Sequence, residues 1–118
     1  MFYNQKLGKW GQEIAIKYLQ AKGYKIIREN IYHRQGEIDI LAIKDGVWRF
    51  IEVKTRSNLK FGEPIQSVSD RKRKHLQNFI DGYVLKNGIK KDYRLEFVFI
   101  LWDQKNNKAK ARHLDNIC

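Results

Sequence analysis

The stretch GEIDILAIKDGVWRFIEVKTR, residues 36–56, decides the fold of this chain. Two runs rich in β-branched and aromatic residues, roughly 37–44 and 47–54, flank Asp45-Gly46, a dipeptide favoured in two-residue hairpin turns. The pattern predicts a β-hairpin in which residue 44 faces residue 47 and the other pairs follow in register. Because side chains alternate across a strand, this register also decides which residues share a face.

In this register both faces of the hairpin are largely apolar, which is typical of central strands covered on both sides. The exception is a polar cluster at the end far from the turn, where Asp39 faces Glu52 and Glu37 faces Lys54. The first face is expected to carry Glu37, Asp39, Leu41, Ile43, Trp48, Phe50, Glu52 and Lys54, and the second Ile38, Ile40, Ala42, Val47, Arg49, Ile51 and Val53.

The opposed carboxylates of Asp39 and Glu52 are expected to repel each other, since such pairs have Cβ atoms roughly 5 Å apart. In a partly buried site, one of the two should hold a proton. A divalent, oxygen-seeking cation such as Mg²⁺ removes the conflict if both carboxylates bind it. Lys54 projects toward the same place, where it can orient a water or stabilise a phosphate. The alternative is a solvated hairpin end in which Glu37 and Lys54 form an ordinary ion pair.

The remaining chain alternates helical and strand patterns, which predicts an α/β domain with a mixed sheet and helices packed on it. A first helix is expected over 5–22, with Asn4 as its N-cap and Gly23 as its stop. A second helix should begin after Ser67 or Ser69 and end near residue 86, with a core stripe of Val68, Leu76, Phe79, Ile80 and Tyr83. Strands are expected over 24–29 and 94–102, and a short edge strand over 108–114.

The composition indicates one domain, residues 1–118, in the cytoplasm. The chain has 24 Lys and Arg against 13 Asp and Glu, a net charge of +11, which favours a nucleic-acid partner. No apolar run is long enough for a membrane span or a signal peptide. The single cysteine, Cys118, has no internal disulfide partner. We interpret His33, His75 and His113, which lack metal-ligand spacing, as surface residues.

Asp39 followed by Glu52-Val53-Lys54 on the next strand resembles the D…(D/E)-x-K signature of restriction-endonuclease-like nucleases. Longer blocks, GEIDILA, FIEVKTR, FGEPIQSV followed by Lys72, and RLEFV, are similar to the YraN-like family of small bacterial proteins. That family is distantly similar to Holliday-junction resolvases. Gly8, Gly11 and Ala15, then YL and KGY, extend the likeness, which covers about residues 7–101.

The resemblance implies a restriction-endonuclease-like fold, a central mixed sheet flanked by helices, and metal-dependent cleavage of phosphodiester bonds. Mg²⁺ or Mn²⁺ would be held by Asp39, Glu52 and the carbonyl of Val53, and Lys54 would position the attacking water. Glu37 could tune Lys54 from the opposite strand, although a purely structural pairing with Lys54 fits it as well.

The chain departs from the family at Gln12, since relatives tend to carry a glutamate at this position of the first helix. Glu13 does not replace it, because a helical wheel places Glu13 on the polar face with Lys9 and Lys17. Gln12 shares the buried side with Gly8, Ala15, Ile16 and Leu19. We therefore expect Gln12 to point toward the site without supplying a charge, which weakens the expected catalysis.

A basic track is expected to hold the phosphate backbone. Arg71 and Lys72 lie at the start of the second helix, where cations are unfavourable because they oppose the helix dipole. Helix stability therefore does not explain them, whereas contact with phosphates would. Arg56 and Lys60 follow the hairpin and extend the track.

The sequence thus favours a metal-dependent endonuclease acting on DNA, including branched or otherwise structured DNA. One alternative is a non-catalytic nucleic-acid-binding module that keeps the nuclease fold, and Gln12 is the feature that favours it. Another is an interaction domain unrelated to nucleic acid, against which the opposed Asp39 and Glu52 argue. A homodimer stays open, as does the substrate structure.

Overall fold

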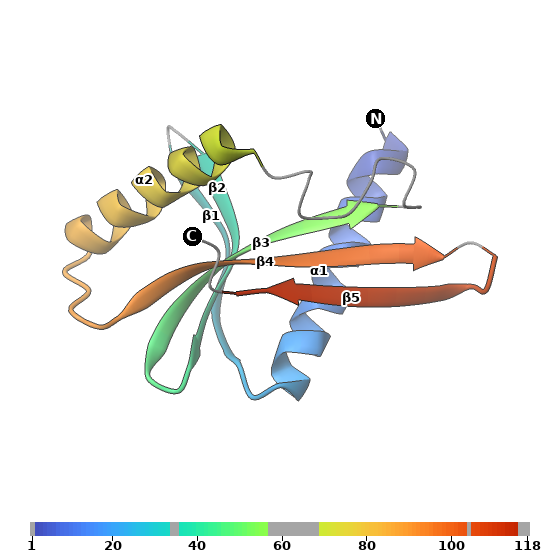
Figure 1. The fold of residues 1–118 in the computed structure, drawn as a ribbon, viewed down its shortest axis with the longest axis horizontal. Coiled ribbons are helices and arrows are strands. Elements are labelled where there is room, and N and C mark those ends of the chain that lie inside the picture. Colours follow the sequence, from blue (N-terminus) through green and yellow to red (C-terminus); the bar gives the residue numbers. More distant parts are fainter. Residues whose placement is uncertain (1, 34–35, 57–68, 104, 116–118) are drawn as a thin grey trace.

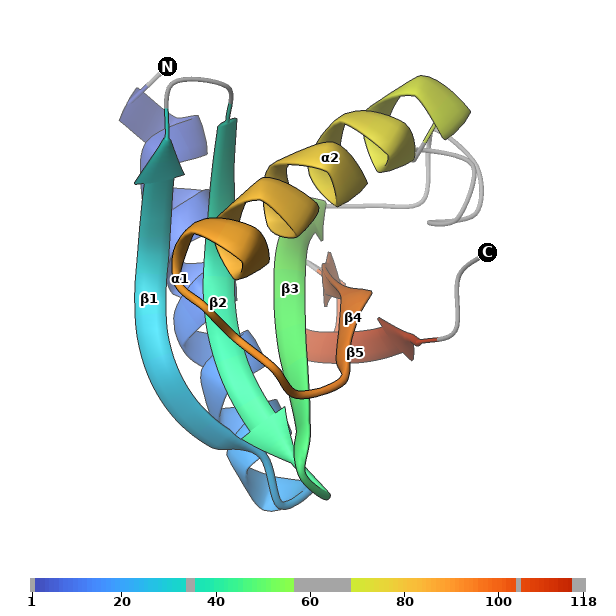
Figure 2. The ribbon, with the colours of Figure 1, turned by 90° about the vertical axis from the view of Figure 1, so that its left-hand side faces the viewer.

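The computed structural model describes residues 2–33, 36–56, 69–103 and 105–115. They form one five-stranded sheet with a helix on each face (Figures 1 and 2). The elements are α1 (Phe2–Ala21), β1 (Lys25–His33), β2 (Gly36–Lys44), β3 (Val47–Arg56), α2 (Asp70–Lys86), β4 (Tyr93–Asp103) and β5 (Lys108–Leu114).

The strands lie in the sheet in their sequence order, from β1 to β5. β3 and β4 pair in parallel, through a crossover that carries α2, and the other neighbours pair antiparallel. The predicted fold class, α/β with a mixed sheet flanked by helices, is confirmed and is compatible with a restriction-endonuclease-like fold.

The β2–β3 hairpin has the predicted register. Asp45 and Gly46 adopt positive φ angles of 54° and 74°, as a two-residue type I′ turn requires. Lys44 pairs with Val47, and the pairing continues to Ile40 and Ile51. Local turn chemistry therefore fixes how the two central strands meet.

The helix ends agree with their sequence signals in two places and differ in one. Ser69 caps α2, because its hydroxyl accepts a hydrogen bond from the Lys72 amide at 3.1 Å. Gly23, with φ of 92°, ends α1 as expected. The predicted N-cap Asn4 is wrong, since α1 already includes Phe2 and the helical backbone continues through residue 4.

The strand expected over 24–29 is longer than predicted, since β1 extends to His33 and pairs with β2 along its length. The edge strand expected over 108–114 is confirmed as β5. Of the α2 core stripe, Leu76, Phe79 and Ile80 are buried and Tyr83 is half-buried, whereas Val68 lies outside the described residues.

Each helix covers its own apolar core. On the α2 side, the core includes Leu41, Phe50, Phe79, Phe97 and Phe99. On the α1 side, the core includes Ala15, Leu19, Ile40, Ile51 and Val98. The central strands are therefore buried on both faces, which explains their continuous apolar runs.

Gly11 allows α1 to approach β3 closely, because a Cβ at this position would overlap the side chain of Thr55. In the part of the chain that the structure describes, no helix is both long and apolar enough to cross a membrane.

Candidate active site

The sheet opens between β2 and β3 at the end far from their turn. The recorded pairs of these two strands end at Ile40 and Ile51, while β2 continues along β1 to Gly36 and β3 continues along β4 to Arg56. Figure 2 shows β2 and β3 moving apart beyond this point. The polar cluster predicted from the sequence lies in the resulting gap.

The alternation of β2 breaks at Asp39, which the sequence did not predict. Ile38 belongs to the core under α2, whereas Ile40 belongs to the core under α1, so the expected placement of Ile38 with Ile40 is wrong. On β1, Asn30 lies at the matching position, between the Glu29–Ile40 and Ile31–Ile38 pairs, with φ of 52°. Both strands change face here.

Asp39 consequently reaches across the gap to β3. Its Oδ2 atom accepts a hydrogen bond from the Val53 amide at 2.7 Å. Since the N–H and C=O of one strand residue face the same neighbour, the Val53 carbonyl also faces the gap. This is the carbonyl predicted to join the two carboxylates as a metal ligand.

Glu52 carries a strongly perturbed carboxyl group beside Asp39. Burial, the hydrogen bond to the Asp39 carboxyl and the charge of Asp39 together raise the pKa of Glu52 to about 8. The predicted repulsion between the two carboxylates is therefore present, and in the metal-free protein it favours a proton on Glu52.

Two lysines border the carboxylates. Lys72 of α2 forms an ion pair with Glu52, with Nζ and Oε2 3.8 Å apart. Burial, together with the neighbouring Lys54, lowers the pKa of Lys72 to about 8. The structure thus places Lys72, predicted as a backbone contact at the helix start, inside the site beside Lys54.

Glu37 lies in the gap without the ion pair that the simpler interpretation assigned to it. Its cross-strand partner is Tyr32 of β1, which hydrogen bonds to it, and no ion pair with Lys54 is present among the described residues. Burial, then the charge of Asp39, raises the pKa of Glu37. The splitting of β2 from β3 explains why Glu37 and Lys54 do not pair.

Two cavities meet at Glu37, Asp39 and Val53. One, of about 670 Å³, opens on the α1 side and reaches Gln12. The other, of about 360 Å³, opens on the α2 side and is lined by Glu52, Lys54, Lys72 and His75. Asp39 is therefore accessible from both faces of the sheet, whereas Glu52 lines only the cavity on the α2 side.

Gln12 points toward the site, as the helical wheel predicted. Its Nε2 atom donates to Asn30 Oδ1 at 3.1 Å and to the Asp39 carbonyl at 3.4 Å. Glu13 is exposed, as expected, although it also lines the α1-side cavity. Gln12 thus holds the backbone of Asp39 rather than its carboxylate.

The groups of the site that could bind a hard cation are two carboxylates and one backbone carbonyl. Among the described residues, no group of three or more His, Cys, Asp or Glu side chains is placed to hold a metal ion. Asp39 and Glu52 offer two close carboxyl groups whose repulsion a cation would relieve, and Val53 offers a carbonyl. Oxygen donors of this kind suit Mg²⁺ or Mn²⁺.

The other predicted backbone contacts are partly described. Arg56 is exposed at the end of β3, and Arg71 is exposed in the first turn of α2. Lys60 lies outside the described residues. Of the three histidines, His75 is exposed as predicted, whereas the side chain of His33 is not described.

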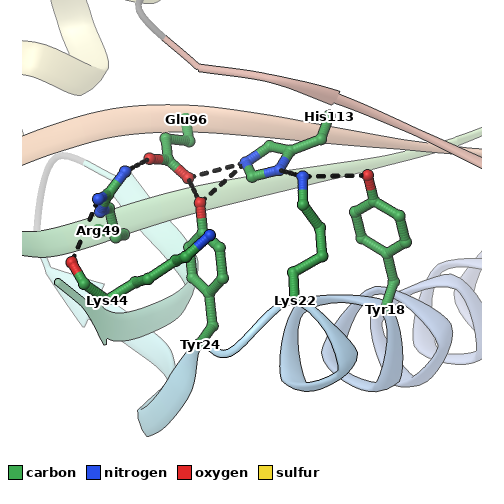
Figure 3. A network of polar contacts seen from close by, with 7 residues as sticks. All are labelled: Tyr18, Lys22, Tyr24, Lys44, Arg49, Glu96 and His113. Atoms are coloured by element: carbon green, nitrogen blue, oxygen red, sulfur yellow. Dashed lines mark hydrogen bonds and ion pairs between the residues drawn. The ribbon is translucent and has the colours of Figure 1, made fainter.

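The sequence missed a second, buried polar cluster on the α1 face, shown in Figure 3. Glu96 is completely buried and bonds to Arg49 at 2.7 Å, to Tyr24 at 2.8 Å and to His113 at 2.8 Å. Burial alone would raise the pKa of Glu96, but these three hydrogen bonds outweigh it and hold the pKa below its ordinary value. The prediction of His113 as a surface residue is wrong, since its side chain is 4% exposed.

Comparison with known proteins identifies the family. The model of the uncharacterised protein family UPF0102 matches residues 11–100. A UPF0102 protein of Alkaliphilus oremlandii is 39% identical over 96% of this chain and 97% of its own. One from Clostridioides difficile is 43% identical over 73% of this chain and 75% of its own. The resemblance to the YraN-like family is confirmed by these matches.

Proposed function

Because the chain belongs to the UPF0102 family and gathers Asp39, Glu52 and Lys54 where its sheet splits, we propose that it is a metal-dependent DNA endonuclease of the cytoplasm. The observation that carries the proposal is the contact between two carboxyl groups, Asp39 and Glu52, with two lysines beside them. The contact between two carboxyl groups costs a structural core stability, whereas a site for phosphodiester chemistry needs carboxylates and lysines gathered in this way.

The residues divide into three roles. Asp39, Glu52 and the Val53 carbonyl would hold Mg²⁺ or Mn²⁺, and the bound ion would supply Lewis-acid activation of water and phosphate. Lys54 would orient the attacking water and neutralise negative charge that develops on the phosphate. Lys72 favours the ionised form of Glu52, since its ammonium group lowers the pKa of that carboxyl.

Arg56 and Arg71 would bind the DNA backbone outside the reacting centre. Glu37, whose pKa burial and the neighbouring charge of Asp39 raise, would tune the electrostatics of the site. The test is incubation of single-stranded, duplex and branched DNA with the protein and Mg²⁺ or Mn²⁺, with EDTA as the metal-free control. Metal-dependent nicking supports the proposal, and its absence on all three substrates contradicts it.

A second candidate function is nucleic-acid binding without cleavage. Gln12 favours it, since this residue stands where the resemblance implies a glutamate and its amide group donates to Asn30 and Asp39. A neutral amide is a weaker ligand for Mg²⁺ than a carboxylate, so the site would hold its ion with two carboxylates.

Replacing Gln12 with Glu separates these two functions. Without metal, the new carboxylate would face three oxygen acceptors, Asn30 Oδ1, the Asp39 carbonyl and Glu29 Oε1, so we expect a loss of about 1–3 kcal/mol of stability. With Mn²⁺ we expect tighter metal binding than in the wild type, and faster cleavage. Calorimetric titration and urea unfolding measure both effects.

Glu13→Ala is the matched control for Gln12→Glu. Glu13 is exposed, so its loss should leave metal affinity and cleavage almost unchanged. If Glu13→Ala abolishes cleavage while Gln12→Glu changes nothing, the assignment of Gln12 to the site-facing side of α1 is wrong.

Salt dependence tests the backbone contacts. Arg56→Ala and Arg71→Ala should each weaken binding to all DNA sequences alike and reduce the slope of log K against log salt by about one unit. Lys90→Ala, which removes an exposed cation from the loop before β4, should leave the slope unchanged. Equal slopes in the wild type and all three variants would exclude Arg56 and Arg71 from the DNA interface.

A further inference from the structure

The face of the sheet that carries Lys54 also carries basic residues on the edge strand β5, separated from those of β3 by the intervening residues of β4. In the recorded register, Lys54 pairs with Phe99, and Phe99 pairs with Arg112. The next row joins Arg56, Leu101 and Lys110 in the same way. Directly paired residues share a face, so each row places a basic residue of β3 and one of β5 on the α2 side, about 10 Å apart.

A third row extends this surface to the start of β5, where Lys108 pairs with Asp103. The carboxylate of Asp103 accepts hydrogen bonds from the amides of Lys105 and Asn106 and from the Asn106 side chain. It is therefore committed largely to its own turn. Lys108, Lys110 and Arg112 are exposed, and we call these three residues the β5 basic strip.

The position of the strip suits a long partner. Figure 1 shows the end of the β4–β5 hairpin extending beyond both helices, so its outer part is not covered by either. From Lys108 to Arg112 the strand spans five residues, or about 13 Å, which matches roughly four phosphate spacings of one DNA strand at about 3.4 Å of axial rise each. The strip leads from the sheet edge to the row of Lys54.

We propose that the β5 basic strip holds the phosphate backbone of a DNA segment beyond the reacting centre, and so fixes the direction in which the substrate leaves the site. The inference rests on the proposed function for the identity of the polyanion. Like charges argue against a second copy of this chain at the edge, because an antiparallel pairing of two β5 strands would bring lysines and arginines together.

The test compares Lys108→Ala/Lys110→Ala with Lys90→Ala/Lys91→Ala, which removes the same charge from exposed positions before β4. Binding of a labelled 30-base-pair duplex is measured by fluorescence anisotropy in EDTA, from 50 to 200 mM salt, so that cleavage does not enter. We expect the β5 variant to lose about ten-fold in affinity at low salt and about two units of salt slope, and the control variant to lose much less.

The outcomes distinguish this inference from the proposed function. If the two double variants bind DNA equally, the β5 strip is not a contact, whether or not the protein cleaves DNA. If the β5 variant alone binds weakly and the wild type cleaves nothing, the strip stands and the endonuclease proposal fails. If the β5 variant binds DNA normally but elutes as a dimer in gel filtration, Lys108 and Lys110 of the wild type serve to protect the sheet edge from pairing with a second copy. That result would overturn the inference.

Discussion

Glu52→Gln is expected to stabilise the metal-free protein at pH 8 by about 1–3 kcal/mol and to remove its stabilisation by Mn²⁺. Because burial and Asp39 raise the pKa of Glu52 to about 8, the folded protein keeps a proton that the unfolded chain releases above its ordinary pKa of 4.5. The free energy of unfolding of the wild type should therefore fall between pH 5 and 8. A glutamine cannot ionise, so the variant should lack this decrease.

Urea unfolding in EDTA at pH 5.5 and 8 measures the first effect, and melting temperature with and without millimolar Mn²⁺ measures the second. The lowered pKa of Lys72 has its own effect above pH 8, outside this window, where it makes stability rise with pH. Glu13→Gln, an exposed carboxylate on α1, is the matched control and should change neither quantity. Equal stabilisation of the wild type and Glu52→Gln by Mn²⁺ would exclude Glu52 as a ligand.

Glu96→Ala is expected to destabilise the protein by about 3–5 kcal/mol, the largest effect on stability that we predict. The substitution leaves the Arg49 guanidinium, 8% exposed, without its carboxylate partner and removes the acceptor of Tyr24 and His113. It also leaves a cavity in the core between α1 and the sheet. Urea unfolding at pH 7 measures the effect.

A second variant separates the charge from the cavity. Arg49→Met combined with Glu96→Gln should lose less than the sum of the two single variants, because neither charge is left alone in the core. Glu13→Ala, which removes an exposed carboxylate, should change stability by less than about 0.5 kcal/mol. If Glu96→Ala behaves like Glu13→Ala, the buried cluster contributes nothing to stability.

The hairpin and the direction of Gln12 could be predicted from the sequence because local chemistry fixes both. Asp45 and Gly46 accept positive φ angles, and the turn then sets the register of the two strands up to Ile40 and Ile51. Helical periodicity likewise separates Gln12 from the exposed Glu13.

The shape of the gap could not be predicted, because it depends on a third strand. The break in alternation at Asp39 accompanies the left-handed backbone of Asn30 on β1, a strand whose register no short turn signal fixes. The same break moves Ile38 to the other core and leaves Glu37 beside Tyr32. The sequence pattern of β2 continues through Asp39 without interruption, so it gave no sign of the break in alternation.

The buried cluster has a signal in the sequence, but this signal can be interpreted only when the parallel register of β3 and β4 is known. Glu96 stands alone among apolar residues in RLEFVFILW, and Arg49 stands alone on an apolar face of the hairpin. Two isolated and opposite charges on central strands favour a buried ion pair. Their strands pair through a crossover rather than a turn, so the register that brings Glu96 near Arg49 had no local signal.

Metal-dependent cleavage of DNA by the wild type and Glu52→Gln is the most direct test of the proposed activity. We expect the wild type to nick duplex or branched DNA slowly with Mn²⁺ or Mg²⁺ and not in EDTA. Glu52→Gln, purified in the same way and shown to be folded, should lose at least about 100-fold of that rate. Equal cleavage by the two proteins, or none by the wild type on single-stranded, duplex or branched DNA, would contradict an active site at Asp39 and Glu52.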